Sequence, residues 1–313
     1  MKVVSIVGGL GSQMFKYAFY LALKEKYQDQ CYIDNSFYSQ RECWNGYELK
    51  RIFGIDAKLF ADVMAEDQLF GYNKNKYYLE SCIDYLKRDN TYYYLMGKRH
   101  RFKKNAKVSK TRLDLIKKVT YLGFFAGIKH SYSLDDFNNS DNIYFDEYFH
   151  NSDEHFSNYK DLIKNTFKFP EFDDEQNKKT SNKMINECSV AIHVRRGDHL
   201  SDNVNLFKYG YYKKAVNHIK NNTKDNLVFY LFSDDLNWCK DNLHELGLEN
   251  DNVVYVDWNK KEGSYKDMQL MTYCQHNVIA ISSFSWWGYY LSKRIDKIVI
   301  SPKKYWLDVK VHY

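Results

Sequence analysis

The stretch that decides the fold reads CSVAIHVRRGD and spans residues 188–198. Its apolar run Val190–Ile192 predicts a buried strand, and a histidine, two arginines, a glycine and an aspartate follow that strand. In open α/β sheets, ligands bind in the crevice outside the carboxyl ends of the strands. Two guanidinium groups at such a place are costly unless an anion lies opposite them. The stretch therefore predicts an anion site at the edge of an α/β sheet.

The charged end of this strand has two interpretations. Because side chains alternate along a strand, His193 and Arg195 share one face, and Gly197 lets the backbone approach a ligand closely. In the functional interpretation, Arg195 and Arg196 give bidentate hydrogen bonds to a diphosphate. In the alternative, the arginines form only a salt bridge with Asp198. We favour the first, because a strand end and a charge cluster coincide here.

The composition is that of a globular and mildly basic chain. Its 313 residues fit two domains at about 150 residues each. The net charge of +6 suits a small anionic ligand as well as nucleic acid. The basic stretch at residues 98–110 is interpreted as a solvated face or loop, with a membrane-surface role as the alternative.

The cysteines and the amino terminus indicate the compartment. The six cysteines form no Cys-x-x-Cys pair, which predicts reduced thiols in a cytosolic protein. The apolar run at the amino terminus is too short for a signal peptide, and no stretch approaches a membrane span. We expect a cytoplasmic protein, with peripheral association at the inner face of the membrane as the secondary interpretation.

The first half opens with a β-α-β pattern around a glycine-rich loop. A strand at residues 3–7 leads into GGLGSQMF at residues 8–15, a helix from about Gln13 to Tyr27, and a second strand, Cys31–Asp34. Such loops expose backbone donors at a helix start and suit anions. Met14 stands where a dinucleotide fingerprint needs its third glycine, and no Walker lysine follows. The loop is therefore a candidate to line a cleft, and a tight structural turn is the alternative.

The second half alternates strand and helix about five times, which predicts a parallel doubly wound sheet. The polar segment Glu171–Lys183 is the best candidate for the boundary between the halves. Besides the arginine strand, the predicted strands cover residues 227–232, 253–256, 278–281 and 298–300, and the predicted helices cover residues 211–221, 234–243 and 267–275 and a segment ending at residue 291.

Polar residues gather at three of the predicted strand ends. The first carries HVRRGD, the second Ser233–Asp235 and the third Ser282–Ser285. Arginines, serine hydroxyls and helix amides bind phosphate, and a carboxylate can accept hydrogen bonds from guanine. Each serine segment alone is also an ordinary helix cap. Their joint placement favours one shared nucleoside diphosphate site.

Several motifs taken together are specific to one family. They are GGLGSQMFKYA at residues 8–18, HVRRGD at residues 193–198, the segments Asp267–Met271 and Ser282–Gly288, and the shorter matches Tyr47–Leu49 and Tyr211–Ala215. This combination resembles the α-1,2-fucosyltransferases of glycosyltransferase family 11, which are related more distantly to α-1,6- and protein O-fucosyltransferases. The resemblance spans nearly the whole chain.

The resemblance implies an α/β fold of the GT-B type, with two Rossmann-like domains facing across a cleft. Residues 1–170 would form the amino-terminal, acceptor-side domain, and residues 171–313 the carboxyl-terminal domain that binds GDP-fucose. Family members invert configuration and need no metal or other cofactor. The sequence agrees, because it contains no Asp-x-Asp motif for a metal-bound diphosphate.

The resemblance also implies residue roles. The expected catalytic residues are Arg195, which would stabilise the β-phosphate leaving group, and Asp198, which would orient the arginines. Asp234 would read guanine, and His193 would lie beside the nucleotide. The expected donor-binding residues are Gly9, Gly11, Ser12, Gln13, His193, Arg195, Arg196, Asp234, Ser282, Ser283, Phe284 and Ser285. No residue is identified as a general base.

The implied reaction is transfer of L-fucose from GDP-β-L-fucose to O2 of a terminal β-galactoside, as in the synthesis of a glycan, surface polysaccharide or lipopolysaccharide. The expected partners are GDP-fucose and a galactose-terminated oligosaccharide, without nucleic acid. The alternatives are another linkage such as α-1,6, another activated sugar, and a non-catalytic nucleotide- or carbohydrate-binding module.

Three positions depart from the family pattern. Ser12 and Ile281 replace frequent asparagines, and Tyr121–Gly127 stands where a Tyr-Trp-Gln-Ser-like stretch is common. These departures leave the donor chemistry intact and bear on the acceptor.

Overall fold

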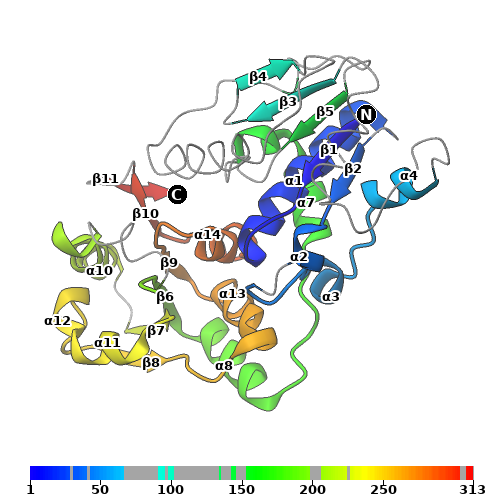
Figure 1. The fold of residues 1–313 in the computed structure, drawn as a ribbon. Coiled ribbons are helices and arrows are strands. Elements are labelled where there is room, and N and C mark those ends of the chain that lie inside the picture. The colour runs from blue at the N-terminus through cyan, green and yellow to red at the C-terminus, as the bar shows by residue number, and fades with distance from the viewer. Residues whose placement is uncertain are drawn as a thin grey trace. The chain divides into compact units, whose positions relative to one another are not determined.

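The chain forms two compact units, Met1–Lys168 and Phe169–Tyr313, each with one sheet and its helices (Figure 1). The division lies two residues before the boundary that we placed after residue 170. The computed structural model describes residues 1–28, 31–40, 43–66, 91–95, 98–101, 134, 142–145, 153–197, 206–223, 226–303 and 308–312. Asp198, Tyr121–Gly127 and residues 102–110 of the basic stretch lie outside these residues.

The amino-terminal unit is built on a five-stranded sheet in the order β2-β1-β5-β3-β4, in which only the β3–β4 pair is antiparallel. Its strands are β1 (Lys2–Ser5), β2 (Cys31–Asp34), β3 (Thr91–Leu95), β4 (Lys98–Arg101) and β5 (Asn142–Phe145). Its helices are α1 (Leu10–Tyr27), α2 (Phe37–Gln40), α3 (Leu49–Phe53), α4 (Phe60–Glu66) and α7 (Lys160–Thr166), with 3-10 turns η3 (Asp153–His155) and η4 (Ser157–Tyr159).

The predicted β-α-β unit is present as β1-α1-β2, but its helix begins earlier than expected. We predicted a start near Gln13, where the apolar spacing becomes regular. The helix begins at Leu10, because the Gly9 carbonyl accepts hydrogen bonds from the backbone N–H groups of Ser12 and Gln13. Helical bonding therefore starts within the glycine loop itself.

The carboxyl-terminal unit is the predicted doubly wound sheet. Its strand order is β11-β10-β9-β6-β7-β8, parallel except for β11. The strands are β6 (Cys188–Val194), β7 (Leu227–Ser233), β8 (Asn252–Tyr255), β9 (His276–Val278), β10 (Val299–Lys303) and β11 (Asp308–His312). The helices are α8 (Glu175–Asn186), α10 (Tyr211–Asn222), α11 (Leu236–Asp241), α12 (Leu243–Leu246), α13 (Tyr265–Met271) and α14 (Ser283–Tyr290), with the 3-10 turn η5 (Lys261–Ser264).

Side chains of the central strand β6 pack in two separate hydrophobic clusters. Val190, Ile192 and Val194 pack in a cluster with residues of α10, and Ala191 packs in a second cluster with residues of α13. A parallel sheet is covered on both faces in this way, because its crossover helices lie on the faces. The same alternation places His193 on the Ala191 face.

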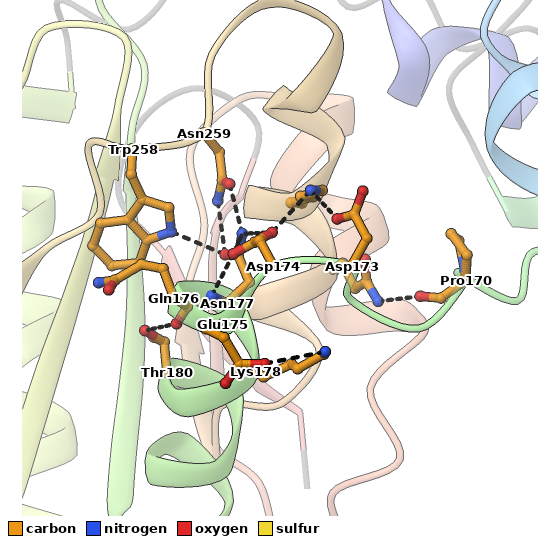
Figure 2. Close-up of polar contacts among 12 residues, drawn as sticks. Pro170, Asp173, Asp174, Glu175, Gln176, Asn177, Lys178, Thr180, Trp258 and Asn259 are labelled. Carbon is orange, nitrogen blue, oxygen red and sulfur yellow. Dashed lines mark hydrogen bonds and ion pairs between the residues drawn. The ribbon is translucent and has the colours of Figure 1, made fainter.

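The polar segment Glu171–Lys183, our candidate for the boundary, lies inside the carboxyl-terminal unit. Most of it forms α8, which is capped by Asp174 accepting a hydrogen bond from the Asn177 N–H at 2.8 Å. The Asn177 side chain is buried and bonds Asn259 and the Trp258 indole (Figure 2). A polar network anchors this helix, so its sequence lacks the apolar stripe that would have identified it.

The first residues of the carboxyl-terminal unit are fixed onto α13. Lys266 pairs with Asp173 and Asp174, and the Gln269 amide donates to the Pro170 carbonyl at 2.6 Å. Helix α13 in turn packs closely on α14. A Cβ at Gly288 would lie only 2.8 Å from the Met271 Cβ, so glycine permits this approach.

None of the helices in the described part of the chain is long and apolar enough to cross a bilayer.

Replacing Gly288 by alanine is expected to destabilise the protein. Overpacking costs about 1–3 kcal/mol, and the better helix propensity of alanine returns up to about 1 kcal/mol, so we expect a net loss of about 1 kcal/mol. Urea unfolding followed by circular dichroism measures it. Gly263→Ala is the control, because no atom lies within 4 Å of its Cβ position. Equal stability of the two variants would contradict the tight α13–α14 contact.

Candidate active site

The candidate site lies where the strand order of the carboxyl-terminal sheet reverses. From β6 the chain passes outward to β7 and β8, then returns across β6 to form β9 and β10. The carboxyl ends of β6 and β9 therefore lie at a topological switch point, the usual ligand site of open α/β sheets. Arg195 follows β6, and Ser282–Ser285 follow β9.

The Arg195 side chain is held by a carboxylate from the next strand. Val194 and Ser233 are paired in register, so the residues after β6 and β7 meet at one edge. Arg195 Nη1 lies 3.0 Å from Asp234 Oδ2, and the Arg196 backbone N–H donates to Asp234 Oδ1 at 2.9 Å. The predicted salt bridge at this strand end thus has Asp234 as a partner, whereas Asp198 is outside the described residues. The expected reading of guanine by Asp234 stays a prediction.

Gly197 is required for this geometry. A Cβ at this position would lie 2.6 Å from Asp234 Oδ2, well inside van der Waals contact. The absence of a side chain at Gly197 lets the backbone pass beside the Asp234 carboxylate, the partner of Arg195.

Arg196 has a different environment from Arg195. Its Nε lies 3.0 Å from Asp235 Oδ2, and its guanidinium carbon lies 3.7 Å from the centroid of the Trp238 ring. Asp235 also caps α11 by accepting a hydrogen bond from the Trp238 N–H. In the Ser233–Asp235 segment, a candidate helix cap in the sequence, Asp235 is thus the cap, while the Ser233 hydroxyl accepts from the Asp235 N–H and the helix begins at Leu236. Arg196 therefore joins the end of β6 to the start of α11.

His193 is a buried neutral group between the two strand ends. It is 6% exposed, and its ring centroid lies 5.8 Å from that of Phe284 on α14. Burial, and then the Arg195 charge, lower the pKa of His193 from 6.5 to about 3. Within the described residues its buried Nδ1 has no hydrogen-bond partner. At neutral pH it can offer a hydrogen bond but no positive charge.

The start of α14 presents the serine segment. Ser282 is the N-cap and accepts from the Phe284 N–H at 3.3 Å, while the buried Ser285 hydroxyl lies 3.4 Å from the Ser282 carbonyl. Ser283 is the first helical residue, and Phe284 packs against the second core cluster. The first turn of a helix favours anions through its N–H groups and dipole. The structure thus brings the histidine and the serine segment together through the His193–Phe284 contact.

The remaining expected donor residues, Gly9, Gly11, Ser12 and Gln13, lie in the amino-terminal unit. Gly8 has a φ of +104° and packs on Ser12, so it forms the turn before α1. Gln13 is completely buried and donates to the Gly8 and Gly46 carbonyls at 3.0 and 2.9 Å. The buried Gln13 side chain thus stabilises the glycine loop through the hydrogen bond to the Gly8 carbonyl.

Sequence reasoning missed the support around Arg196, which involves Asp235, Trp238 and Phe207. Phe207 lies 4.9 Å from Trp238, centroid to centroid, and 5.6 Å from the guanidinium. The signal was present in part: paired arginines end one strand and paired aspartates end the strand beside it. No group of three or more metal-ligating side chains occurs among the residues that the structure describes.

Residues 2–309 match the model of Glycosyl transferase family 11. The chain belongs to this family. It is 39% identical over 119 residues to an α-1,2-colitosyltransferase of Escherichia coli, an alignment that covers 36% of this chain and 40% of the relative. It is 35% identical over 125 residues to the O-antigen biosynthesis glycosyltransferase WbnK of Escherichia coli, covering 38% and 40%. The alignments thus span about two fifths of these curated relatives.

The fold of this family 11 member is that of known fucosyltransferases. The solved structure of NodZ α-1,6-fucosyltransferase soaked with GDP-fucose matches with a TM-score of 0.50 and 12% identity, covering 99% of this chain and 98% of that one. This likeness concerns the fold, and it agrees with the GT-B type that the motifs implied.

The two arginines are expected to differ in their effect on stability. Arg196→Ala removes an ion pair and a stacked guanidinium, which we expect to cost about 1–3 kcal/mol. Arg195→Ala removes a partly exposed ion pair and should cost about 0–1 kcal/mol. Urea unfolding of both variants measures the difference. An Arg195→Ala loss as large as that of Arg196→Ala would contradict this division.

The buried neutral His193 makes stability depend on pH. The unfolded state takes up a proton near pH 6.5 and the folded state only near pH 3. Neutral His193 therefore makes its full contribution to the free energy of unfolding above pH 6.5. As the pH is lowered from 6.5 to 3, this contribution decreases by about 1.4 kcal/mol per pH unit. His193→Gln does not titrate, so wild type should lose stability relative to this variant between pH 6 and pH 4. Parallel losses in urea unfolding would show that His193 is not buried as a neutral group.

Proposed function

We propose that this family 11 glycosyltransferase moves L-fucose from GDP-β-L-fucose to O2 of a terminal β-galactoside, with inversion to an α-1,2 linkage. The observation that carries the proposal is the Arg195–Asp234 ion pair at the switch point between β6 and β9, the strand that α14 follows. Family membership supplies the reaction class, and the α-1,2 linkage is the one in the name of the Escherichia coli relative.

The proposed chemistry uses Arg195 where negative charge develops. As the bond from C1 of fucose to the β-phosphate oxygen breaks, positive charge grows on the sugar and negative charge on GDP. A guanidinium carries five N–H donors, so its ion pair with Asp234 is compatible with a contact to phosphate. Positioned donors of this kind contribute about 3–4 kcal/mol to such a step. The first-turn N–H groups of α14 add a second, fixed positive field.

The acceptor completes the balance. Galactose O2 bonds to C1 on the face opposite GDP, the bond to phosphate breaks, and the hydroxyl proton is released. Neutral His193 would hydrogen-bond the nucleotide. We propose no metal and no cofactor, because arginine and the helix start supply positive charge at the diphosphate. Asp198 remains the proposed second orienting residue.

Arg195→Ala is expected to lower fucosyl transfer by about 100–1,000-fold, through loss of leaving-group stabilisation. GDP release from GDP-fucose with lactose as acceptor measures it, with EDTA added in a parallel series to test independence from metal. Arg294→Ala is the matched control, since this arginine bonds Gln275 and the Ile185 carbonyl away from the site. Near wild-type transfer by Arg195→Ala would remove the proposed role.

A second donor is favoured by one observation. The relative that shares 39% identity with the matched segment is named for colitosyl transfer. Colitose is the 3-deoxy form of L-fucose, so the same diphosphate contacts would serve both sugars. Parallel GDP-release assays with both nucleotide sugars distinguish them.

The acceptor and setting are proposed from the O-antigen relative. We propose a galactose-terminated precursor of a surface polysaccharide, modified in the cytoplasm with peripheral membrane association as the alternative. Linkage determination by NMR of the product separates α-1,2 from α-1,6 transfer. A binding module without catalysis would retain GDP-fucose without releasing GDP.

A further inference from the structure

Trp44 is unusual in both exposure and backbone conformation. Three large hydrophobic side chains are exposed among the described residues, and Trp44, at 54%, is the one in the amino-terminal unit. Its φ is +51°, a left-handed conformation that bulky residues rarely adopt. Such conformations persist where the surroundings enforce them, and they concentrate at ligand sites.

The turn that carries Trp44 is tied to the glycine loop by a buried amide. The Gly46 N–H donates to the Cys43 carbonyl at 3.2 Å and closes the turn. The Gln13 amide donates to the Gly46 carbonyl, while its oxygen accepts from the Glu48 N–H at 2.9 Å. Because Gln13 also holds the Gly8 carbonyl, one side chain fixes both the glycine loop and the Trp44 turn.

A second aromatic ring lies beside Trp44. The Phe37 ring centroid is 6.1 Å from that of Trp44, with an angle of 32° between the planes, and Phe37 is only partly buried. A Cβ at Gly9 would lie 3.6 Å from the indole Cδ1, so the indole packs beside backbone that carries no side chain. The Trp44 indole thus lies beside the glycine loop, and the Phe37 ring is tilted against the indole.

Two basic side chains of the amino-terminal unit make polar contacts within that unit. Lys16 is buried and donates to the Val7 carbonyl at 2.6 Å, and Arg51 pairs with Glu48 at 2.7 Å. These cations are engaged within the unit, whereas the arginines suited to a diphosphate lie in the other unit. A sugar ring is neutral and presents a face of C–H groups that matches an aromatic surface.

We propose that Trp44 and Phe37 form a stacking platform for the galactose ring of the acceptor. This inference rests on the proposed function for the identity of the sugar. It assigns acceptor binding to the amino-terminal unit through two aromatic rings, and it gives Gln13 the role of positioning the turn that presents Trp44.

The test separates acceptor binding from donor chemistry. Trp44→Gly removes the ring, and glycine adopts a positive φ without strain, so the fold should be kept. We expect the KM for lactose to rise about tenfold, the equivalent of about 1.4 kcal/mol, with the KM for GDP-fucose unchanged. Trp44→Phe keeps an aromatic ring and should raise the KM for lactose less than Trp44→Gly does. Ile295→Ala, an exposed apolar control at 79%, should change neither constant.

Saturation-transfer NMR with methyl β-galactoside and no donor gives an independent readout. Wild type should transfer magnetisation to the C–H protons of the sugar, and Trp44→Gly should lose this transfer. An unchanged lactose KM in Trp44→Gly, or a raised GDP-fucose KM instead, would overturn the platform while leaving the proposed function intact. Wild type that neither binds nor modifies any β-galactoside would overturn the proposed function itself, and the platform with it.

Discussion

The carboxylate of Asp234 is the group on which the candidate active site depends. One oxygen holds the Arg195 guanidinium and the other holds the Arg196 backbone N–H, so a single side chain joins the ends of β6 and β7. Gly197 leaves the space that this requires. A buried or half-buried guanidinium needs a counter-charge, and the protein supplies it itself. The arginine pair is therefore stable as part of the fold, and the fold itself orients Arg195.

Two adjacent arginines serve different purposes here. Arg196 is stacked on Trp238 and paired with Asp235, and so belongs to the packing between β6 and α11. Arg195 pairs with Asp234 at the switch point. A rigid neighbour makes the position of Arg195 reproducible, and preorganised donors gain their effect from not having to rearrange during reaction.

Much of the carboxyl-terminal unit could be predicted from the sequence. Apolar runs of strand length alternate with helical spacing, so the parallel sheet and the gathering of polar strand ends followed directly. Helix α8 could not be predicted, because it is stabilised by the Asp174 cap and by hydrogen bonds of the Asn177 side chain with Trp258 and Asn259, which lie far along the chain. The partner of Arg195 was also missed, since a carboxylate three residues along the chain competed with one on the neighbouring strand. The spacing of apolar residues in the sequence indicates which side chains are buried. It does not indicate which polar side chains form hydrogen bonds or ion pairs with one another.

The strand order has a consequence for synthesis of the protein. Arg195 follows β6, while the serine segment at α14 follows β9, its neighbour in the sheet but far along the chain. A ribosome-bound chain that has completed β6, β7 and β8 possesses the arginines and aspartates but lacks the serine segment at the start of α14. Pairing of β9 with β6 is a contact of long sequence separation, which forms late. The proposed donor site at the ends of β6 and β9 is therefore incomplete on a partly synthesised chain, and it is completed only when β9 pairs with β6.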